Sequence, residues 1–333
     1  MNTPAFFESP SRRRFILQGL SAAGGALIGN DLIAKEAVAA AQPKSEKLVA
    51  TLYKSLTPEQ HSAICFAFDH PLRSKVNNNW HITKDRIDKL LNSDQQAMVR
   101  EIFLNLHSEE YAGKVMQQVT DDSKDVGGFG DSSIALFGDP DAGKFEFVLT
   151  GRHCTRRCDG NSVAGAAFGG PIFYGHAATG FNEPADHKGN IYWYQAQRAN
   201  HVYQMLDGKQ RAVALRDKTR EEEGNKTVNL TGKVGGIDGI SMTALSADQK
   251  GEVRNVLGDL LKPFRKQDAD EALKLIEKSG FDNLSLAFYK EGDIGNDGVW
   301  DNWKLEGPNM VWYFRGAPHV HCWVHVRENA VVS

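Results

Sequence analysis

The chain has 333 residues, with 39 lysine and arginine residues against 42 aspartate and glutamate residues, and a formal net charge of −3 at pH 7. This near-neutral balance argues against nucleic acid as a partner, because a phosphate-binding surface usually gives a chain a basic excess. The hydrophobic content of 41% is ordinary for a soluble globular protein. The length allows one large domain, or two small ones that share a core.

The first 41 residues are predicted to be a twin-arginine export signal that is cleaved. Residues 11–17 read Ser-Arg-Arg-Arg-Phe-Ile-Leu, and small residues offer cleavage after Ala39 or Ala41. The apolar run of residues 20–32 is too short and too weak to span a bilayer. We therefore expect a periplasmic or extracellular protein, exported folded by the twin-arginine machinery and without a membrane segment in its mature form. Export of a folded protein also favours a cofactor that is inserted in the cytoplasm.

A Leu-cap-x-x-Gln element occurs four times, and each copy reads as the start of a helix. The residue after the leucine is a good N-cap, and the glutamine at the third helical position can reach back to the cap amide. The copies begin at Leu56, Leu91, Leu206 and Leu245. The third and fourth copies follow the first and second by about 150 residues.

Two strand-like segments repeat at a similar distance. Residues 133–137 resemble residues 285–289, and residues 145–151 resemble residues 300–307. The spacings predict an internal duplication of a helix-helix-strand-strand-strand unit. Because hairpin strands and helices are segregated, we expect an α+β fold with an antiparallel sheet and helices packed around it. The predicted halves are residues 46–158 and 206–328, fused into one domain.

Residues 159–205 separate these halves and are predicted to form a glycine-rich functional loop followed by a connecting helix. The stretch of residues 159–190 is long and irregular yet apolar, which is typical of a packed functional loop rather than a linker. A second irregular stretch, residues 216–239, is charged and then glycine-rich. We expect it to be a solvated excursion.

The C-terminal segment, residues 318–326, alternates in the manner of a strand. With a period of two, His319, His321, Trp323 and His325 share one face. Imidazoles two residues apart on a strand are about 7 Å apart at Cα, so both rings can converge on one ion. His-x-His on a strand is a common way to present two metal ligands. The alternative is that these histidines form hydrogen bonds within a sheet.

The segment of residues 151–158, which is rich in cysteine and arginine, supplies the third candidate ligand, His153. If this segment is a strand, His153 faces opposite to Cys154 and Cys158. A site of His153, His319 and His321 would be a three-imidazole set with an open position, which suits Zn, Cu or non-haem Fe. Further candidates for a ligand or for the surrounding shell are His176, His325 and Cys154.

The four cysteines, Cys65, Cys154, Cys158 and Cys322, are predicted to reach a compartment that permits disulfides. Cys154 and Cys158 on one strand would be about 13 Å apart, which is beyond the span of a disulfide. A bond between Cys154 and Cys322 on neighbouring strands is therefore favoured. A weaker hypothesis gives Cys154 and Cys158 a redox role.

Several motifs together resemble the bacterial family known as domain of unknown function 3500. They are Leu-Thr-Pro-Glu-Gln at 56–60, Phe-Asp-His-Pro at 68–71, Trp-His at 80–81, Gly-x-His at 151–153, Glu-Gly-Pro at 306–308 and His-x-His at 319–321. The resemblance runs from about residue 46 to residue 328. The family pattern at the first site is Gly-His-His-Leu, whereas this chain has Gly-Arg-His-Cys, so Arg152 replaces one imidazole. The resemblance implies export and the pairing of Gly-x-His with His-x-His, and no reaction.

Arg152 and Arg156 could hold the carboxylate or phosphate of a small-molecule substrate beside such a site. The competing interpretation is that they pair with surface acids. The leading hypothesis is an exported metal-binding protein that acts on a small molecule as a metalloenzyme, either an oxidoreductase or a hydrolase. The alternative is a non-catalytic periplasmic protein that binds a ligand or a partner.

Overall fold

The computed structural model describes residues 44–177, 189–295 and 297–330, and residues 42–333 group into one compact unit. The predicted export signal lies outside the described residues. Within the described part of the chain, no helix is both long enough and apolar enough to cross a membrane.

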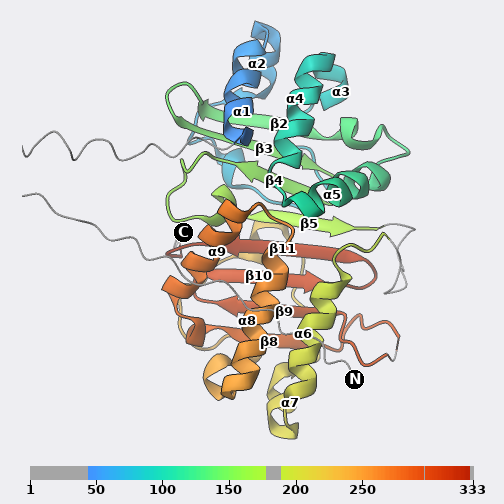
Figure 1. Ribbon diagram of the computed structural model, residues 1–333, viewed down its shortest axis with the longest axis vertical. Helices are drawn as coiled ribbons and strands as arrows, with labels where there is room; N and C mark the ends of the chain where they lie inside the picture. Colours follow the sequence, from blue (N-terminus) through green and yellow to red (C-terminus); the bar gives the residue numbers. More distant parts are fainter. Residues whose placement is uncertain (1–43, 178–188, 296, 331–333) are drawn as a thin grey trace, which may run out of the picture. The chain divides into compact units, whose positions relative to one another are not determined.

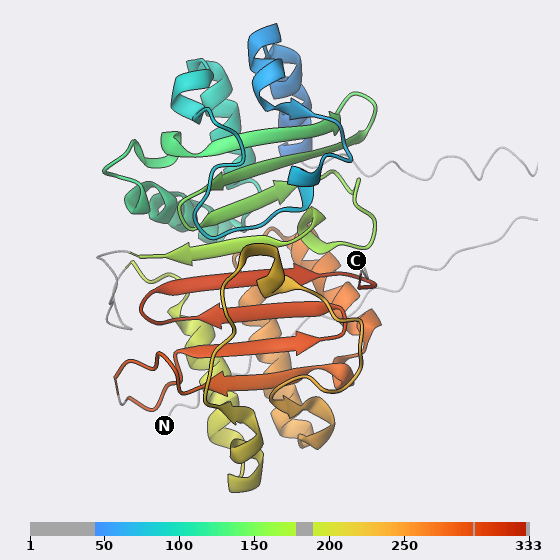
Figure 2. The ribbon, with the colours of Figure 1, turned by 180° about the vertical axis from the view of Figure 1, so that it is seen from behind.

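An eleven-stranded sheet runs through this unit (Figures 1 and 2). The strand order is β1-β2-β3-β4-β5-β11-β10-β9-β8-β6, with β7 paired to β8 off this path. All pairs are antiparallel except β1 with β2 and β6 with β8. The strands are β1 Cys65–Phe66, β2 Ser133–Asp139, β3 Lys144–Gly151, β4 Cys154–Cys158, β5 Ile172–His176, β6 Leu215–Arg216, β7 Ile240–Ser241, β8 Ser285–Tyr289, β9 Asn302–Gly307, β10 Met310–Arg315 and β11 Val320–Val326.

The described residues form nine α-helices, most of which cover one face of the sheet, while α2 and α7 extend beyond its two ends (Figure 1). They are α1 Lys44–Ser55, α2 Pro58–Ile64, α3 Ile87–Leu90, α4 Ser93–Leu104, α5 Glu109–Asp122, α6 Trp193–Met205, α7 Gly208–Ala214, α8 Ala247–Leu261 and α9 Lys266–Ser279. Helices and strands are thus segregated, and the sheet is largely antiparallel. The predicted α+β class is confirmed.

The four predicted helix starts are confirmed at α2, α4, α7 and α8. Each has a capping box, in which the N-cap side chain and the glutamine at the third helical position satisfy each other's backbone amides. The glutamines also pair between helices. The Nε2 of Gln60 donates to Oε1 of Gln95 at 2.9 Å, and the Nε2 of Gln210 donates to Oε1 of Gln249 at 3.0 Å. Each pair therefore joins two helix starts from one predicted half.

The elements follow one another in the same order on both sides of the sheet centre. The series α1, α2, β1, α4, α5 and β2 to β5 has its counterpart in α6, α7, β6, α8, α9 and β8 to β11. Each series occupies one end of the sheet, and β5 meets β11 in the middle.

The glycine-rich stretch between the predicted halves contains β5, so the expectation of a loop throughout residues 159–190 was wrong. All five β5 residues are buried, and the strand pairs with both β4 and β11. Gly175 allows the close approach of β11, because a Cβ at this position would lie 2.3 Å from the carbonyl oxygen of Val320. The strand is short and flanked by glycines, which hides it in the sequence.

Two irregular segments cross the face opposite the helices (Figure 2). The first packs Leu72 and Trp80 against β2 and β3. The second packs Val228 and Leu230 against aromatic side chains of β10 and β11. Val228 and Leu230 are 1% and 5% exposed. The expectation that residues 216–239 form a solvated excursion was therefore wrong for this part of the stretch.

Candidate metal centre

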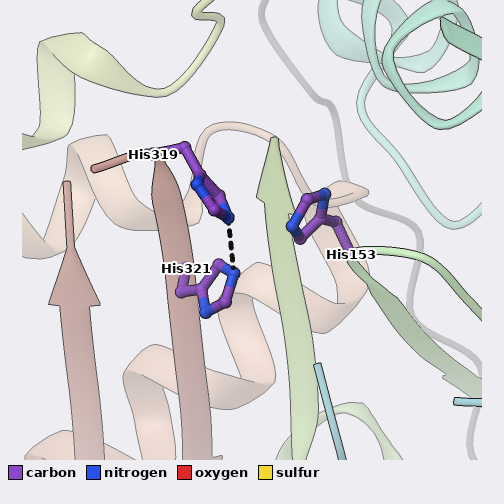
Figure 3. A group of neighbouring side chains, drawn as sticks. All are labelled: His153, His319 and His321. Carbon is purple, nitrogen blue, oxygen red and sulfur yellow. Dashed lines mark hydrogen bonds between the residues drawn. The ribbon is translucent and has the colours of Figure 1, made fainter. Parts of the chain in front are cut away.

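Three histidines from two distant parts of the sequence meet at one end of β5. One ring nitrogen from each of His153, His319 and His321 lies within 4.8 Å of the others. The ring centroids are 4.7–5.1 Å apart, and the three side chains point toward one another (Figure 3). All three side chains are buried.

His153 lies in the two-residue turn between β3 and β4, so the condition that its segment is one continuous strand is not met. Gly151 pairs with Cys154, which leaves Arg152 and His153 as the turn. The backbone φ of His153 is +53°, in the left-handed region that residues other than glycine rarely adopt. Such a conformation persists only where the surroundings enforce it, and it is frequent at functional sites.

His321 and His319 come from β11 and from the position just before it. His321 pairs with Gly175 of β5 on one side and with Arg315 of β10 on the other. Gly175 has no side chain, so the ring of His153 can reach across β5 to that of His321. The period of two that we read in the sequence holds here, because His319 and His321 extend from the same face of the sheet (Figure 3).

Two carboxylates fix the orientation of two of the rings. Oδ2 of Asp122 accepts from Nδ1 of His153 at 2.7 Å, and Oε2 of Glu222 accepts from Nδ1 of His321 at 2.7 Å. A carboxylate accepts a hydrogen bond from Nδ1–H, and in the neutral ring this leaves Nε2 with a lone pair. This carboxylate–histidine arrangement is the usual outer shell of a metal ligand.

The Nε2 atoms of His319 and His321 are 3.0 Å apart. Two imidazole nitrogens bound to one tetrahedral ion at about 2.05 Å would be about 3.3 Å apart. The observed pair therefore needs almost no movement to share an ion. His153 has further to move, since the nitrogens of the group spread over as much as 4.8 Å.

The electrostatics of the centre favour a neutral His321 and ionised Asp122 and Glu222. Burial opposes ionisation of Asp122 and Glu222, but the hydrogen bonds from His153 and His321 hold both carboxyl pKa values below their usual range. Burial lowers the pKa of His321 to about 4, although Glu222 acts in the opposite direction. Neutral imidazole is the form that binds a metal ion.

A pocket of about 410 Å³ opens onto the three histidines. Its wall also contains Arg152, from the turn that carries His153, and Arg315, the partner of His321 on β10. The volume is within the range of sites for small molecules.

A family model described as a protein of unknown function, DUF3500, matches residues 39–329. The chain belongs to the DUF3500 family. The resemblance read from its motifs is thereby confirmed. No match was found among curated proteins, and none among solved structures.

In this DUF3500 protein the remaining histidines of the predicted site lie outside the group of three. His176 is the last residue of β5, and its Nδ1 is 3.8 Å from Oδ1 of Asp122, which places it behind His153. His325 lies four residues beyond His321 on β11, about 13 Å away at Cα. Nδ1 of His325 contacts the carbonyl oxygen of Val228 at 3.0 Å. The expectation that His325 serves the centre is therefore wrong.

Arg156 and Cys154 also lie away from the pocket, on the face of the sheet that the helices cover. Nε of Arg156 donates to Nε2 of His107 at 3.2 Å, and its guanidinium lies over the rings of Tyr174 and Phe264. Arg156 is 3% exposed, so the proposal that it holds a substrate anion was wrong. Cys154 is part of the hydrophobic core.

The cysteines do not form the expected disulfide. All four are free thiols. Cys154 and Cys322 both pair with Tyr174, from opposite sides, so β5 separates them and they are not on neighbouring strands. Burial raises the pKa of the Cys154 thiol to about 11 and raises that of Cys158 well above its usual value. A reactive thiol has a lowered pKa, so the redox hypothesis is not supported.

Sequence reasoning missed Asp122, Glu222 and Arg315. Asp122 is the last residue of α5, where a helical pattern gives no sign of a functional role. Glu222 stands in a run of three glutamates that reads as solvated surface. Arg315 could have been found from the strand pairing. It lies on β10 and is the cross-strand partner of His321 on β11, and a short turn connects these two strands.

We expect acid to destabilise the fold because of two histidines, the buried His107 and the half-buried His325. Burial lowers the pKa of His107 to about 3, with Arg156 acting in the same direction, and burial lowers that of His325 to about 4. Histidine in the unfolded chain has a pKa near 6.5. Below that pH the unfolded state therefore binds protons at these two positions, while the folded state does not. The stability that each histidine contributes is fully present above about pH 6.5. At pH 5 the free energy of unfolding is lower than above pH 6.5 by about 2 kcal/mol per histidine.

Urea unfolding of metal-free protein at pH 7 and pH 5 checks this. His325→Asn, whose amide can keep the bond to Val228, should recover about 2 kcal/mol of the loss at pH 5. The same change at the exposed His61 is the matched control. Equal losses in His325→Asn and in the unchanged protein would contradict the prediction.

Proposed function

We propose that the protein binds one transition metal ion, Zn, Cu or Fe, through His153, His319 and His321. One observation carries this proposal, which is that three buried imidazoles converge while carboxylates orient two of them from behind. Histidines that only stabilise a sheet do not need ring nitrogens that converge on one position. His325, on the same strand, shows such a structural role through its bond to a carbonyl group.

We propose further that the centre is catalytic and acts on a small molecule. A three-imidazole set leaves a coordination position open, where a bound metal ion supplies Lewis acidity or redox chemistry. Asp122 and Glu222 hold the rings of His153 and His321 in the tautomer that binds an ion. The pocket of about 410 Å³ admits a substrate to this position. Hydrolase and oxidoreductase chemistry are both compatible with these residues.

We also propose that the chain is exported by the twin-arginine route, in which it would acquire the ion before it leaves the cytoplasm. The motif at residues 11–17 supports this proposal.

An origin by internal duplication is proposed for the fold. It is supported by the same order of elements at both ends of the sheet and by the two glutamine pairs. The pocket would then belong to only one of the two equivalent positions, because the β9–β10 turn has Pro308 and Asn309 where the β3–β4 turn has Arg152 and His153.

Elemental analysis of the protein expressed with its own signal, and purified in its folded form from the periplasm, tests the function. About one transition metal ion per chain is expected, because the described residues contain one set of three converging imidazoles. A stable, correctly exported protein without metal, which also takes up none from added Zn²⁺, would refute the proposal. That result would favour the non-catalytic alternative.

A further inference from the structure

Two arginines flank the three histidines in the pocket wall. Arg152 precedes His153 in the β3–β4 turn, and Arg315 on β10 is the cross-strand partner of His321. The two guanidinium groups therefore come from opposite sides of the histidine group, and both line the same pocket.

Arg315 is fixed beside the centre by the carboxylate that orients His321. Oε2 of Glu222 holds Nδ1 of His321, and its other oxygen, Oε1, lies 3.4 Å from Nε of Arg315. Nε of Arg315 is buried but donates no hydrogen bond to any residue that the structure describes. Glu222 thus holds the Nε side of the guanidinium electrostatically, and neither Nη atom of Arg315 forms a hydrogen bond with a residue that the structure describes.

Arg152 is exposed and forms no ion pair within the described residues. No aspartate or glutamate is present among the described residues that line the pocket. Asp122 and Glu222 lie behind the histidines, and their two negative charges offset the two arginines. A bound divalent ion would then leave the pocket with an excess of positive charge, which attracts anions.

The structural arginines of the same protein behave differently. Arg156 and Arg157 are both 3% exposed and bond to internal acceptors. Nε of Arg156 donates to His107, and Nε of Arg157 donates to the carbonyl oxygen of Pro171 at 2.6 Å. Arg152 has no ion pair within the described residues, and Arg315 has only its contact with Glu222, so the two pocket arginines call for a different explanation.

We infer that the pocket binds a small molecule that carries a carboxylate or phosphate group, and that Arg152 and Arg315 hold this group beside the metal. Guanidinium groups bind such oxyanions with paired, charge-assisted hydrogen bonds. The inference deepens the proposed function and rests on it for the role of the metal. It assigns the substrate class, a small molecule with a carboxylate or phosphate group, and it identifies Arg315 as a residue that binds this group.

Calorimetric titration of the Zn²⁺-loaded protein tests this inference. Succinate and inorganic phosphate are the anionic probes, and succinamide is the neutral counterpart of succinate. At least one anion should bind, while succinamide should bind at least about tenfold more weakly. Arg315→Gln and Arg152→Gln should each weaken anion binding by about tenfold or more, and Arg216→Gln, on an exposed arginine, should have no effect.

Metal content measured in each variant separates the two proposals. Comparison of the affinities for succinate and phosphate shows whether the pocket prefers a carboxylate or a phosphate group. Binding that is equal for succinate and succinamide, unchanged in both arginine variants, or absent for both anions in metal-loaded protein would overturn the inference and leave the metal centre intact. If the protein takes up no Zn²⁺, the metal proposal fails. Anion binding by the metal-free protein that still depends on both arginines would then support the anion site alone, and its absence would refute it.

Discussion

Replacement of His153 or His321 by alanine is expected to lower the affinity for a metal ion by more than 100-fold. Loss of an outer-shell partner alone typically costs 10–100-fold, and loss of a ligand removes the bond that the partner only supports. Each variant would leave two imidazoles from the group of three. Competition with a chelator of known affinity measures the effect.

His325→Ala is the matched control for these variants. It removes a half-buried histidine from the same strand and should leave metal affinity unchanged, because its ring bonds to Val228 and not to the centre. Asp122→Asn and Glu222→Gln should give intermediate losses of about 10–100-fold, since they alter the groups that orient His153 and His321. Near-normal affinity in folded His153→Ala would contradict the assignment.

The strand period and the capping chemistry could be predicted from the sequence because they depend on neighbours only. The alternation around His321 requires one strand, and the capping box at Asn92 requires four consecutive residues. The strands β2 and β8 were also recognisable from their apolar runs. These features describe the parts of the site but not how the parts meet.

The rest of the centre depends on contacts between distant segments. β5 is a strand mainly because β4 and β11 pair with it on both sides, and its own five residues include Gly175. The left-handed backbone of His153 follows from a hairpin whose register the sequence does not reveal. Asp122 and Glu222 reach their histidines across 31 and 99 residues. No local pattern could therefore identify them.

Replacement of Glu146 by glutamine is expected to lower the free energy of unfolding by about 3–5 kcal/mol. The Glu146 side chain on β3 is fully buried, and its Oε1 accepts from Nη1 of Arg157 at 2.5 Å. Its Oε2 accepts from Nη1 of Arg73 at 2.9 Å. The variant leaves the buried Arg157 without its countercharge, and such an uncompensated ion is far more costly than the pair is worth.

The effect should extend to the segment that crosses the sheet near Arg73. Arg157 also donates to the carbonyl oxygens of Lys75 and Pro171, at 2.5 and 2.6 Å, so one side chain joins that segment to the start of β5. Urea unfolding monitored by circular dichroism measures the loss. Glu101→Gln, which breaks only an exposed pair with Lys44, should change stability by less than about 0.5 kcal/mol.

A double variant distinguishes the value of the ion pair from the penalty of an unpaired charge. If Glu146→Met and Arg157→Met together cost much less than Glu146→Gln alone, the isolated charge is the cause of the loss. If the double variant is the less stable of the two, the hydrogen bonds of Arg157 to Lys75 and Pro171 carry the stability instead. A loss below about 1 kcal/mol in Glu146→Gln would contradict both explanations, because a neutral amide would then replace the buried carboxylate without penalty.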